Sequence, residues 1–183
     1  MKKALMIASV ASMIDLFNME NIEILQKMGF EVHVACNFEY GSITSKERVK
    51  EFRQSLEKRG IKTFHIPIPR SIFSVKEILK SFILLKNIRD NNIYQIVHCH
   101  SPIGGAIARL VFKNKRKSGA KVIYTAHGFH FYKGAPFKNW LIFYPIEKWL
   151  SNYTDCLITI NSEDFNIAIE KKFKAKSIEK ING

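Results

Sequence analysis

Residues 94–112 read YQIVHCHSPIGGAIARLVF, a stretch that predicts a buried strand running directly into a helix. The apolar run 94–99 is the expected strand. Ser101 followed by Pro102 favours a helix start, because a hydroxyl can cap the first turn and proline fits the first helical position. The expected helix buries a face made of Ile103, Ala106, Ile107 and Leu110. A strand that leads straight into a helix is the repeating unit of parallel α/β sheets.

The same alternation continues along the chain in both directions. Further strands are expected at 3–10, 32–36, 62–66, 121–126, 156–160 and 177–181, and further helices at 15–28, 45–59, 74–91 and from Ser162. The strands are mostly continuous apolar runs, which is typical of parallel strands buried on both faces. We therefore predict an α/β fold, a doubly wound, Rossmann-like parallel sheet with helices on both faces.

Composition indicates a folded domain without a membrane span. The 183 residues are 46% hydrophobic and 25% charged, and no segment approaches the roughly 20 apolar residues of a spanning helix. Lys2, Lys3 and the apolar run 4–11 imitate a secretion signal, but a helix and a second strand follow at once, so we interpret the run as a first strand. Three cysteines without framework spacing favour a reducing compartment. We expect a single cytoplasmic domain over 1–183.

The chain is strongly basic, since 29 Lys and Arg against 16 Asp and Glu give a formal net charge of +13. Such a charge suits an anionic partner, which would be nucleic acid, a phosphorylated substrate or an acidic membrane surface. Charge alone does not choose among them, because runs such as 113–117 also solvate a helix. The chain carries no recognised nucleic-acid-binding motif, and so we expect no nucleic-acid partner.

Ligands of open parallel sheets bind beyond the carboxyl ends of the strands, near the point where the strand order reverses. Four predicted loops reach that edge: 9–15, 100–105, 127–134 and 161–164. The first contains no glycine, so the G-x-G-x-x-G dinucleotide motif is absent and a dehydrogenase is disfavoured. In the second, backbone N–H groups at a helix start can receive an anion, while Gly104 and Gly105 serve either ligand contact or helix–sheet packing.

His127 is the single residue that most clearly indicates a functional site. It follows a predicted parallel strand and precedes Gly128, which places an imidazole where a ligand would lie; the alternative is a histidine bonded to a loop carbonyl. His98 and His100 share one side of their strand and, together with the later histidines, suggest a metal cluster. No carboxylate or cysteine stands at the spacing of a zinc site, so we expect no metal and read His98 as a core residue.

The segment 137–153 carries too many large apolar residues for one buried stripe, and Pro145 is expected to kink or restart its helix. One interpretation is a membrane or acceptor surface made by Trp140, Phe143 and Trp149, since tryptophan suits an interface and nearby lysines would meet anionic lipid. The other is that the segment packs inside this domain or against a domain outside the chain. The sequence leaves both open.

The chain has a first strand that runs into an early Phe17, followed by VHVA at 32–35, VHCHSPIGG at 97–105 with Arg109, YTAHGFHFYKG at 124–134, YPIEKW at 144–149, YTD at 153–155 and ITIN at 158–161. Together these motifs resemble bacterial family-four glycosyltransferases of capsule and exopolysaccharide synthesis. The resemblance covers essentially the whole chain and is specific as a set. One departure is the loop after the first strand, where many relatives have a glycine pair and this chain has ASVAS at 8–12.

The resemblance implies the GT-B fold, in which two Rossmann-like domains face each other across a cleft. A sugar is then transferred with retention from a nucleotide-sugar donor, without an essential metal or other cofactor. Residues 1–183 correspond to the N-terminal, acceptor-side domain, so the C-terminal donor-binding domain is absent from this chain and the chain alone is expected to be inactive. His127 takes the catalytic position. The implied substrate-binding residues are Ser9, Ser12, His100, Ser101, Gly104, Gly105, Gly128, His130 and Lys133.

The implied acceptor is a lipid-linked saccharide at the inner face of the plasma membrane, so we also expect peripheral contact with anionic lipid. The basic and aromatic composition agrees with this expectation. The alternative is a non-catalytic binding or scaffold domain of a polysaccharide-assembly complex. A second run of strands and helices beyond Gly183, carrying a glutamate pair, would favour the enzyme.

Overall fold

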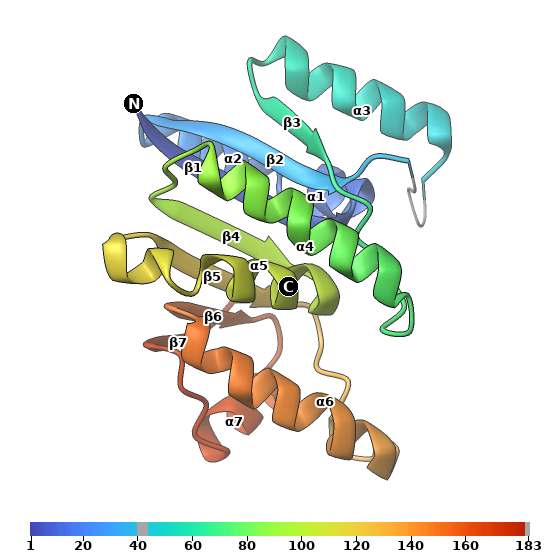
Figure 1. Ribbon diagram of the computed structural model, residues 1–183. Coiled ribbons are helices and arrows are strands. Elements are labelled where there is room, and N and C mark those ends of the chain that lie inside the picture. Colours follow the sequence, from blue (N-terminus) through green and yellow to red (C-terminus); the bar gives the residue numbers. More distant parts are fainter. Residues whose placement is uncertain (40–43, 182–183) are drawn as a thin grey trace.

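Seven parallel strands form one sheet in the computed structural model, which describes residues 1–39 and 44–181. In spatial order the strands are β3 (Lys62–His65), β2 (Phe30–Asn37), β1 (Lys2–Val10), β4 (Ile96–His100), β5 (Lys121–Ala126), β6 (Cys156–Thr159) and β7 (Ser177–Lys180). Every neighbouring pair is parallel (Figure 1). The strand order therefore reverses between β1 and β4, and the predicted doubly wound parallel sheet is confirmed.

Helices cover both faces of the sheet. On one face lie α1 (Ala11–Phe17), α2 (Met19–Lys27) and α3 (Lys46–Lys58), and on the other lie α4 (Val75–Asp90), α5 (Pro102–Phe112), α6 (Phe137–Leu150) and α7 (Ser162–Glu170). The 3₁₀ helices η1 (Lys115–Ser118) and η2 (Ser151–Tyr153) precede β5 and β6. None of the helices in the described ranges is long and apolar enough to cross a bilayer.

Strand β1 shows why the apolar runs are continuous. Ala4 and Met6 belong to the hydrophobic core beneath α2 and α3, whereas Leu5 and Ile7 belong to the core beneath α4 and α5. All four side chains are fully buried. Successive residues of a strand point to opposite faces, so a strand covered on both faces is mostly apolar along its whole length.

Two helices differ from their predictions. The helix expected at 15–28 is divided at Asn18, whose side-chain amide donates to the carbonyl of Met13 at 2.8 Å, and its first part begins at Ala11, directly after β1. Pro145 does not restart α6, which runs through it from Phe137 to Leu150. A proline within a helix removes the donor for the carbonyl four residues earlier, and the residue there, Leu141, is exposed to solvent.

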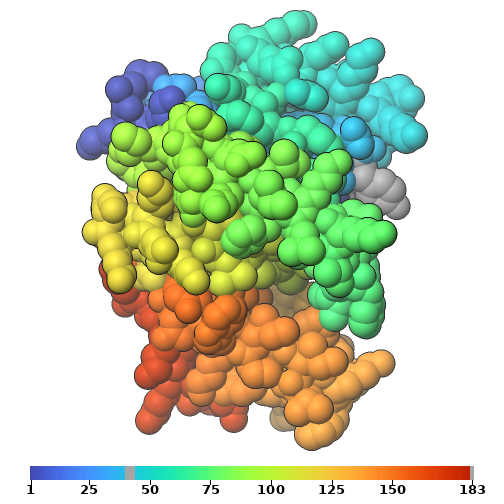
Figure 2. All heavy atoms as spheres, in the orientation of Figure 1, coloured from blue at the N-terminus to red at the C-terminus, as the bar shows by residue number. Residues whose placement is uncertain are grey.

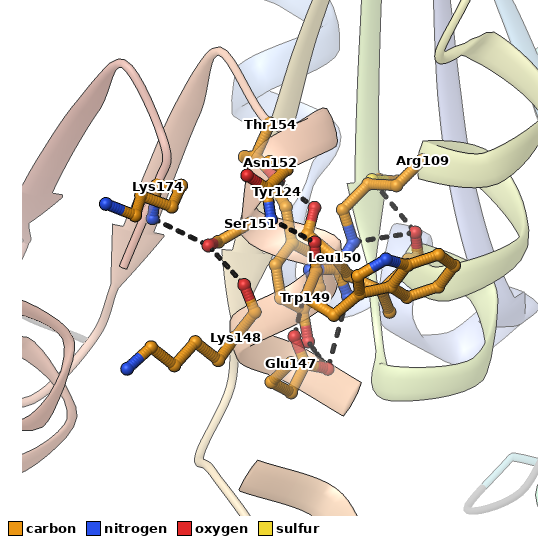
Figure 3. Close-up of polar contacts among 12 residues, drawn as sticks. Arg109, Tyr124, Glu147, Lys148, Trp149, Leu150, Ser151, Asn152, Thr154 and Lys174 are labelled. Carbon is orange, nitrogen blue, oxygen red and sulfur yellow. Dashed lines mark hydrogen bonds and ion pairs between the residues drawn. The ribbon is translucent and has the colours of Figure 1, made fainter. Parts of the chain in front are cut away.

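A buried ion pair fastens α6 to α5 (Figure 3). Nη1 and Nη2 of Arg109 donate to Oε2 and Oε1 of Glu147 at 2.9 and 3.2 Å, and Nε of Arg109 donates to the carbonyl of Gly105 at 3.0 Å. The guanidinium carbon also lies 4.0 Å from the ring centroid of Tyr124 on β5. This network holds α6 beside the sheet, and α6 carries Phe143, which forms part of the site described next.

Candidate active site

A cavity of about 530 Å³ opens at the carboxyl end of the sheet, next to the point where the strand order reverses between β1 and β4. Its lining includes seven residues that the sequence had singled out: Ser9, Ser12, Ser101, His127, Gly128, His130 and Phe143. They come from the end of β1 and the start of α1, the start of α5, the loop after β5, and α6. This is where ligands of doubly wound sheets bind.

Ser9 and Ser101 join the two strands at the reversal point. The backbone N–H of Ser9 donates to Oγ of Ser101 at 3.0 Å, and the two hydroxyl oxygens lie 2.8 Å apart. The helix begins after Ser101 as predicted, but the Ser101 hydroxyl accepts no hydrogen bond from the first turn of α5, so its predicted role as a side-chain cap is wrong. Ser101 instead adopts a φ of 62°, and its hydroxyl ties the ends of β1 and β4 together beneath the cavity.

Gly104 and Gly105 lie behind the cavity wall, and helix packing explains both. A Cβ added at Gly105 would come within 2.5 Å of Cε2 of Tyr124, so only glycine lets α5 pack this closely on β5. A Cβ at Gly104 would lie 3.1 Å from Oγ of Ser101 and 3.3 Å from the backbone nitrogen of Ser9. The sequence left open whether these glycines serve ligand contact or helix–sheet packing. Their surroundings are explained by packing.

Three histidines, two on β4 and one in the loop after β5, lie in a row toward the cavity. The ring centroids of His98 and His100 are 4.3 Å apart, and those of His100 and His127 are 5.4 Å apart. His98 is buried and bonded to Oγ1 of Thr125 at 2.8 Å, which confirms it as a core residue. His100 is also buried, whereas His127 is half-buried and lines the cavity. Across 1–39 and 44–181, no group of three or more His, Cys, Asp or Glu is arranged to hold a metal ion.

The hydrogen bonds of His100 determine the tautomer of His127. Burial lowers the pKa of both imidazoles, and that of His100 falls well below its ordinary value, so both rings are neutral near pH 7. Nε2 of His100 lies 3.2 Å from Sδ of Met6, which only accepts, so Nε2 carries the hydrogen and Nδ1 of His100 is an acceptor. Nδ1 lies 3.1 Å from Nε2 of His127, which must therefore donate. We assign the unprotonated nitrogen of His127 to Nδ1.

The loop after β5 is held in place by the first turn of α7. The backbone N–H of Phe129 donates to Oδ2 of Asp164 at 2.9 Å, and Asp164 accepts a further bond from the side chain of Asn161 at 3.0 Å. Burial raises the pKa of the Asp164 carboxyl. The sequence placed 161–164 at this edge of the sheet but did not indicate that Asp164 anchors the histidine loop.

The remaining predicted residues of this loop lie in two places. His130 is exposed at the cavity, with its ring centroid 4.7 Å from that of Phe143. Lys133 lies away from the cavity, in a shallow hollow with Trp140 and Glu163, and its backbone N–H donates to the Glu163 carboxylate.

The three aromatic residues assigned to one surface have different surroundings. Trp140 is half-buried, packs on Phe131 at a centroid distance of 5.5 Å and donates from Nε1 to the carbonyl of Tyr132 at 3.2 Å. Phe143 is half-buried against the core and lines the cavity. Trp149 is 49% exposed and lies edge-on to Tyr153. Trp140 and Phe143 therefore pack against this domain, whereas other apolar side chains of the segment are exposed, among them Phe137 at 81%, Leu141 at 66% and Ile146 at 46%.

The loop after β3 supplies one wall of the cavity that was not predicted from the sequence. Arg70, Ile72 and Phe73 of this loop line the cavity, and Phe17 from α1 faces His127 with ring centroids 6.4 Å apart. A signal was available, because this loop also follows a parallel strand and must emerge at the same edge of the sheet. The wall adds a cation and several apolar groups to a site whose floor is made of hydroxyls and imidazoles.

Comparison with known proteins agrees with this geometry. The chain matches the family model described as "Glycosyl transferase 4-like" over residues 6–161. The chain belongs to this family. Within it, the chain is 44% identical over its whole length to the "Putative glycosyltransferase EpsD" of Bacillus subtilis (strain 168), of which it covers 42%. It is 26% identical, over 85% of its length, to the UDP-Gal:alpha-D-GlcNAc-diphosphoundecaprenol alpha-1,3-galactosyltransferase of Escherichia coli, of which it covers 37%.

Solved structures show the same fold. All 183 residues superimpose on 45% of the chain of UDP-N-acetylglucosamine 2-epimerase from Rickettsia bellii, with a TM-score of 0.64 and 14% sequence identity. MurG from Acinetobacter baumannii matches 90% of the chain with a TM-score of 0.57 and 15% identity, over 43% of its own chain. At these identities the likeness concerns the fold alone. The chain spans about two fifths of the length of these proteins.

Proposed function

We propose that this chain is the acceptor-side domain of a retaining glycosyltransferase that acts in the cytoplasm. The enzyme moves a sugar from a nucleotide-sugar donor to a lipid-linked saccharide during synthesis of a surface polysaccharide. The observation that carries the proposal is the position of His127, a half-buried neutral imidazole in the wall of a cavity at the strand-order reversal. Ligands of doubly wound sheets bind at that point.

The cavity has the groups that such an acceptor requires. With Nε2 engaged by His100, Nδ1 of His127 is the ring atom that accepts a hydrogen bond from a sugar hydroxyl. Ser9, Ser12 and Ser101 add hydroxyls, the guanidinium of Arg70 supplies positive charge for a phosphate, and the apolar rim suits a lipid. A ligand that is at once polyol, anion and lipid would use every part of this lining.

The donor-binding domain is proposed to lie outside the 183 residues. The two relatives are much longer than the matched region, since the chain covers 42% of one and 37% of the other. The Escherichia coli relative is named for a UDP-sugar donor and a diphosphoundecaprenol-linked acceptor, which supports the same classes of substrate here. The family match and the names of both relatives support glycosyl transfer. They do not favour the alternative of a non-catalytic scaffold domain.

The test uses a polypeptide that carries this chain and extends to the length of its relatives, assayed with a panel of nucleotide sugars and a lipid-linked saccharide. His127→Ala is expected to lower turnover by about 10²-fold or more, as loss of a positioned polar group at a reaction centre does. His65→Ala is the control, because His65 lies on β3 outside the cavity. Unchanged turnover in His127→Ala would remove His127 from the mechanism. Transfer by the 183 residues alone would show that the donor site is not elsewhere.

A further inference from the structure

We propose that Asp164 is a positioning residue that fixes the place of the His127 imidazole in the cavity. It acts through the backbone of Phe129 and does not itself line the cavity. The inference rests on the proposed function, because it matters for sugar transfer only if His127 works at the reaction centre. The effect on the imidazole can nevertheless be measured without any transfer reaction.

The backbone after His127 needs an anchor from elsewhere in the fold. The sheet holds the chain up to Ala126, which pairs with Thr159, and His127 is the first residue beyond the strand. Gly128 follows with a φ of 121°, a conformation that glycine adopts together with many others. Gly128 therefore supplies no local preference that would keep His127 in place, and the next fixed point must come after it.

Asp164 supplies this fixed point. Its Oδ2 accepts hydrogen bonds from the backbone N–H of Phe129 at 2.9 Å and from Nδ2 of Asn161 at 3.0 Å. Asp164 is only 2% exposed and Phe129 only 6%, so no solvent-exposed side chain competes for this bond. A buried N–H without an acceptor is costly, which favours the loop conformation in which Phe129 reaches Asp164.

The carboxylate of Asp164 is itself held rigidly. Its backbone N–H donates to Oδ1 of Asn161 at 2.7 Å, and Ala168, one helical turn further along α7, is fully buried in the core. Figure 1 shows α7 beside β6 and β7 at one end of the sheet, and Figure 2 shows α6 in orange and the red residues after it packed together at the same end of the molecule. Asp164 is thus carried by a helix that is fixed to the sheet containing β5.

The hydrogen bond between His127 and His100 reports the position of the loop. Nε2 of His127 lies 3.1 Å from Nδ1 of His100, which is close to the limit for a good hydrogen bond. A loop that moves when Phe129 is released would lengthen this contact. The His127 ring would then lose the partner that selects its tautomer and its orientation toward the cavity.

Glu163 provides a matched control on the same turn of α7. Its carboxylate also accepts a backbone N–H of the loop, that of Lys133. This bond is exposed to solvent and lies six positions beyond His127. Removal of either carboxylate therefore takes one acceptor from the loop, but only the loss of Asp164 should reach the imidazole.

The first experiment uses nitrogen-15 NMR of the 183-residue chain with labelled imidazoles. In Asp164→Ala, His127 is expected to populate both neutral tautomers, whereas Glu163→Ala should give the spectrum of the parent chain. Asp164→Asn should restore the parent spectrum, because both bonds converge on one oxygen and an amide oxygen can accept them. Circular dichroism checks that each variant is folded. If alanine unfolds the chain, Asp164→Glu carries the test, since its longer side chain should also displace the loop.

The second experiment is a double-mutant cycle in the longer polypeptide that transfers sugar. Asp164→Ala is expected to lower kcat about tenfold or more, because a displacement of about 1 Å in a reacting group costs up to about 10²-fold. Asp164→Ala/His127→Ala should turn over as fast as His127→Ala alone, because no imidazole is left to position. A purely structural role of Asp164 would instead lower the activity of both backgrounds by the same factor.

Three results would overturn the proposal. One is an unchanged His127 spectrum in folded Asp164→Ala, or in Asp164→Glu where alanine does not fold. Another is an equal change of that spectrum in Glu163→Ala, which would mean a general loosening of the loop. The third is equal loss of kcat in both backgrounds of the cycle. If His127→Ala keeps full turnover while Asp164→Ala still shifts the His127 spectrum, the proposed function fails and the positioning of the imidazole stands.

Discussion

Nδ1 of His100 and Nε2 of His127 lie 3.1 Å apart, although 26 residues separate the two histidines in the chain. The register of β4 and β5 pairs His100 with Thr125, so His127 emerges two positions beyond the end of the ladder and turns its ring toward its neighbour. Met6 on β1 holds the far side of the His100 ring. Three adjacent strands thereby orient one half-buried imidazole at the cavity.

Replacement of His100 is expected to let the His127 imidazole populate both of its neutral tautomers. In the parent chain at pH 7, the ring nitrogen spectrum of His127 should show a protonated Nε2 and an unprotonated Nδ1. In His100→Leu the partner is lost, so both tautomers should be populated, and the free energy of unfolding should fall by about 1 kcal/mol for the lost hydrogen bond. Nitrogen-15 NMR with imidazole labelling measures the first effect and urea unfolding the second. A protonated Nδ1 in the parent chain would contradict the assignment.

Stability should fall as the pH is lowered from neutrality. Burial lowers the pKa of His98 to about 4, whereas the ordinary value is 6.5. Below pH 6.5 the His98 imidazole binds a proton in the unfolded chain but stays neutral in the folded chain. The free energy of unfolding therefore decreases by about 1.4 kcal/mol per pH unit for this histidine until about pH 4. His100 and His127 shift in the same direction and add to the loss. Urea unfolding at pH 7, 6 and 5 measures the slope.

His98→Gln is the control for this pH dependence. Glutamine keeps a polar group beside Thr125 but does not titrate, so the variant should lose less stability than the parent chain between pH 6.5 and pH 5, by about 2 kcal/mol. An identical slope in both proteins would mean that His98 does not remain neutral in the folded chain.

Much of the fold followed from local patterns. The expected strand 121–126 coincides with β5, because a buried parallel strand is a continuous apolar run that ends where the chain reaches solvent. The carboxyl-end rule then predicted that residues as distant as Ser9 and His127 would share one edge of the sheet, and both line the cavity.

Other features could not be predicted because they depend on residues far apart in the sequence. Ser101 has the residue type and the position of a helix cap, but its hydroxyl oxygen accepts a hydrogen bond from the backbone N–H of Ser9, which is 92 residues away in the sequence. The crowding at Gly105 comes from the ring of Tyr124 on the neighbouring strand β5. Local propensity does not contain these competitors.

The Arg109–Glu147 ion pair should be costly to break from one side. Glu147→Leu leaves the guanidinium of Arg109 buried without its counter-charge, and the expected loss is about 3–5 kcal/mol of unfolding free energy. Arg109→Met/Glu147→Leu removes both charges and should recover most of that loss. Urea unfolding of the single and double variants measures the difference. A single variant as stable as the parent chain would show that solvent reaches the pair.

The two tryptophans of α6 should respond differently to the same substitution. Trp140→Ser removes a side chain that packs on Phe131 and donates to the carbonyl of Tyr132, so a loss of about 2 kcal/mol in unfolding free energy is expected. Trp149→Ser removes a half-exposed ring and should cost about 1 kcal/mol or less. Urea unfolding of the two variants measures the difference. Equal losses would mean that the half-exposed ring of Trp149 contributes as much to packing as the half-buried ring of Trp140.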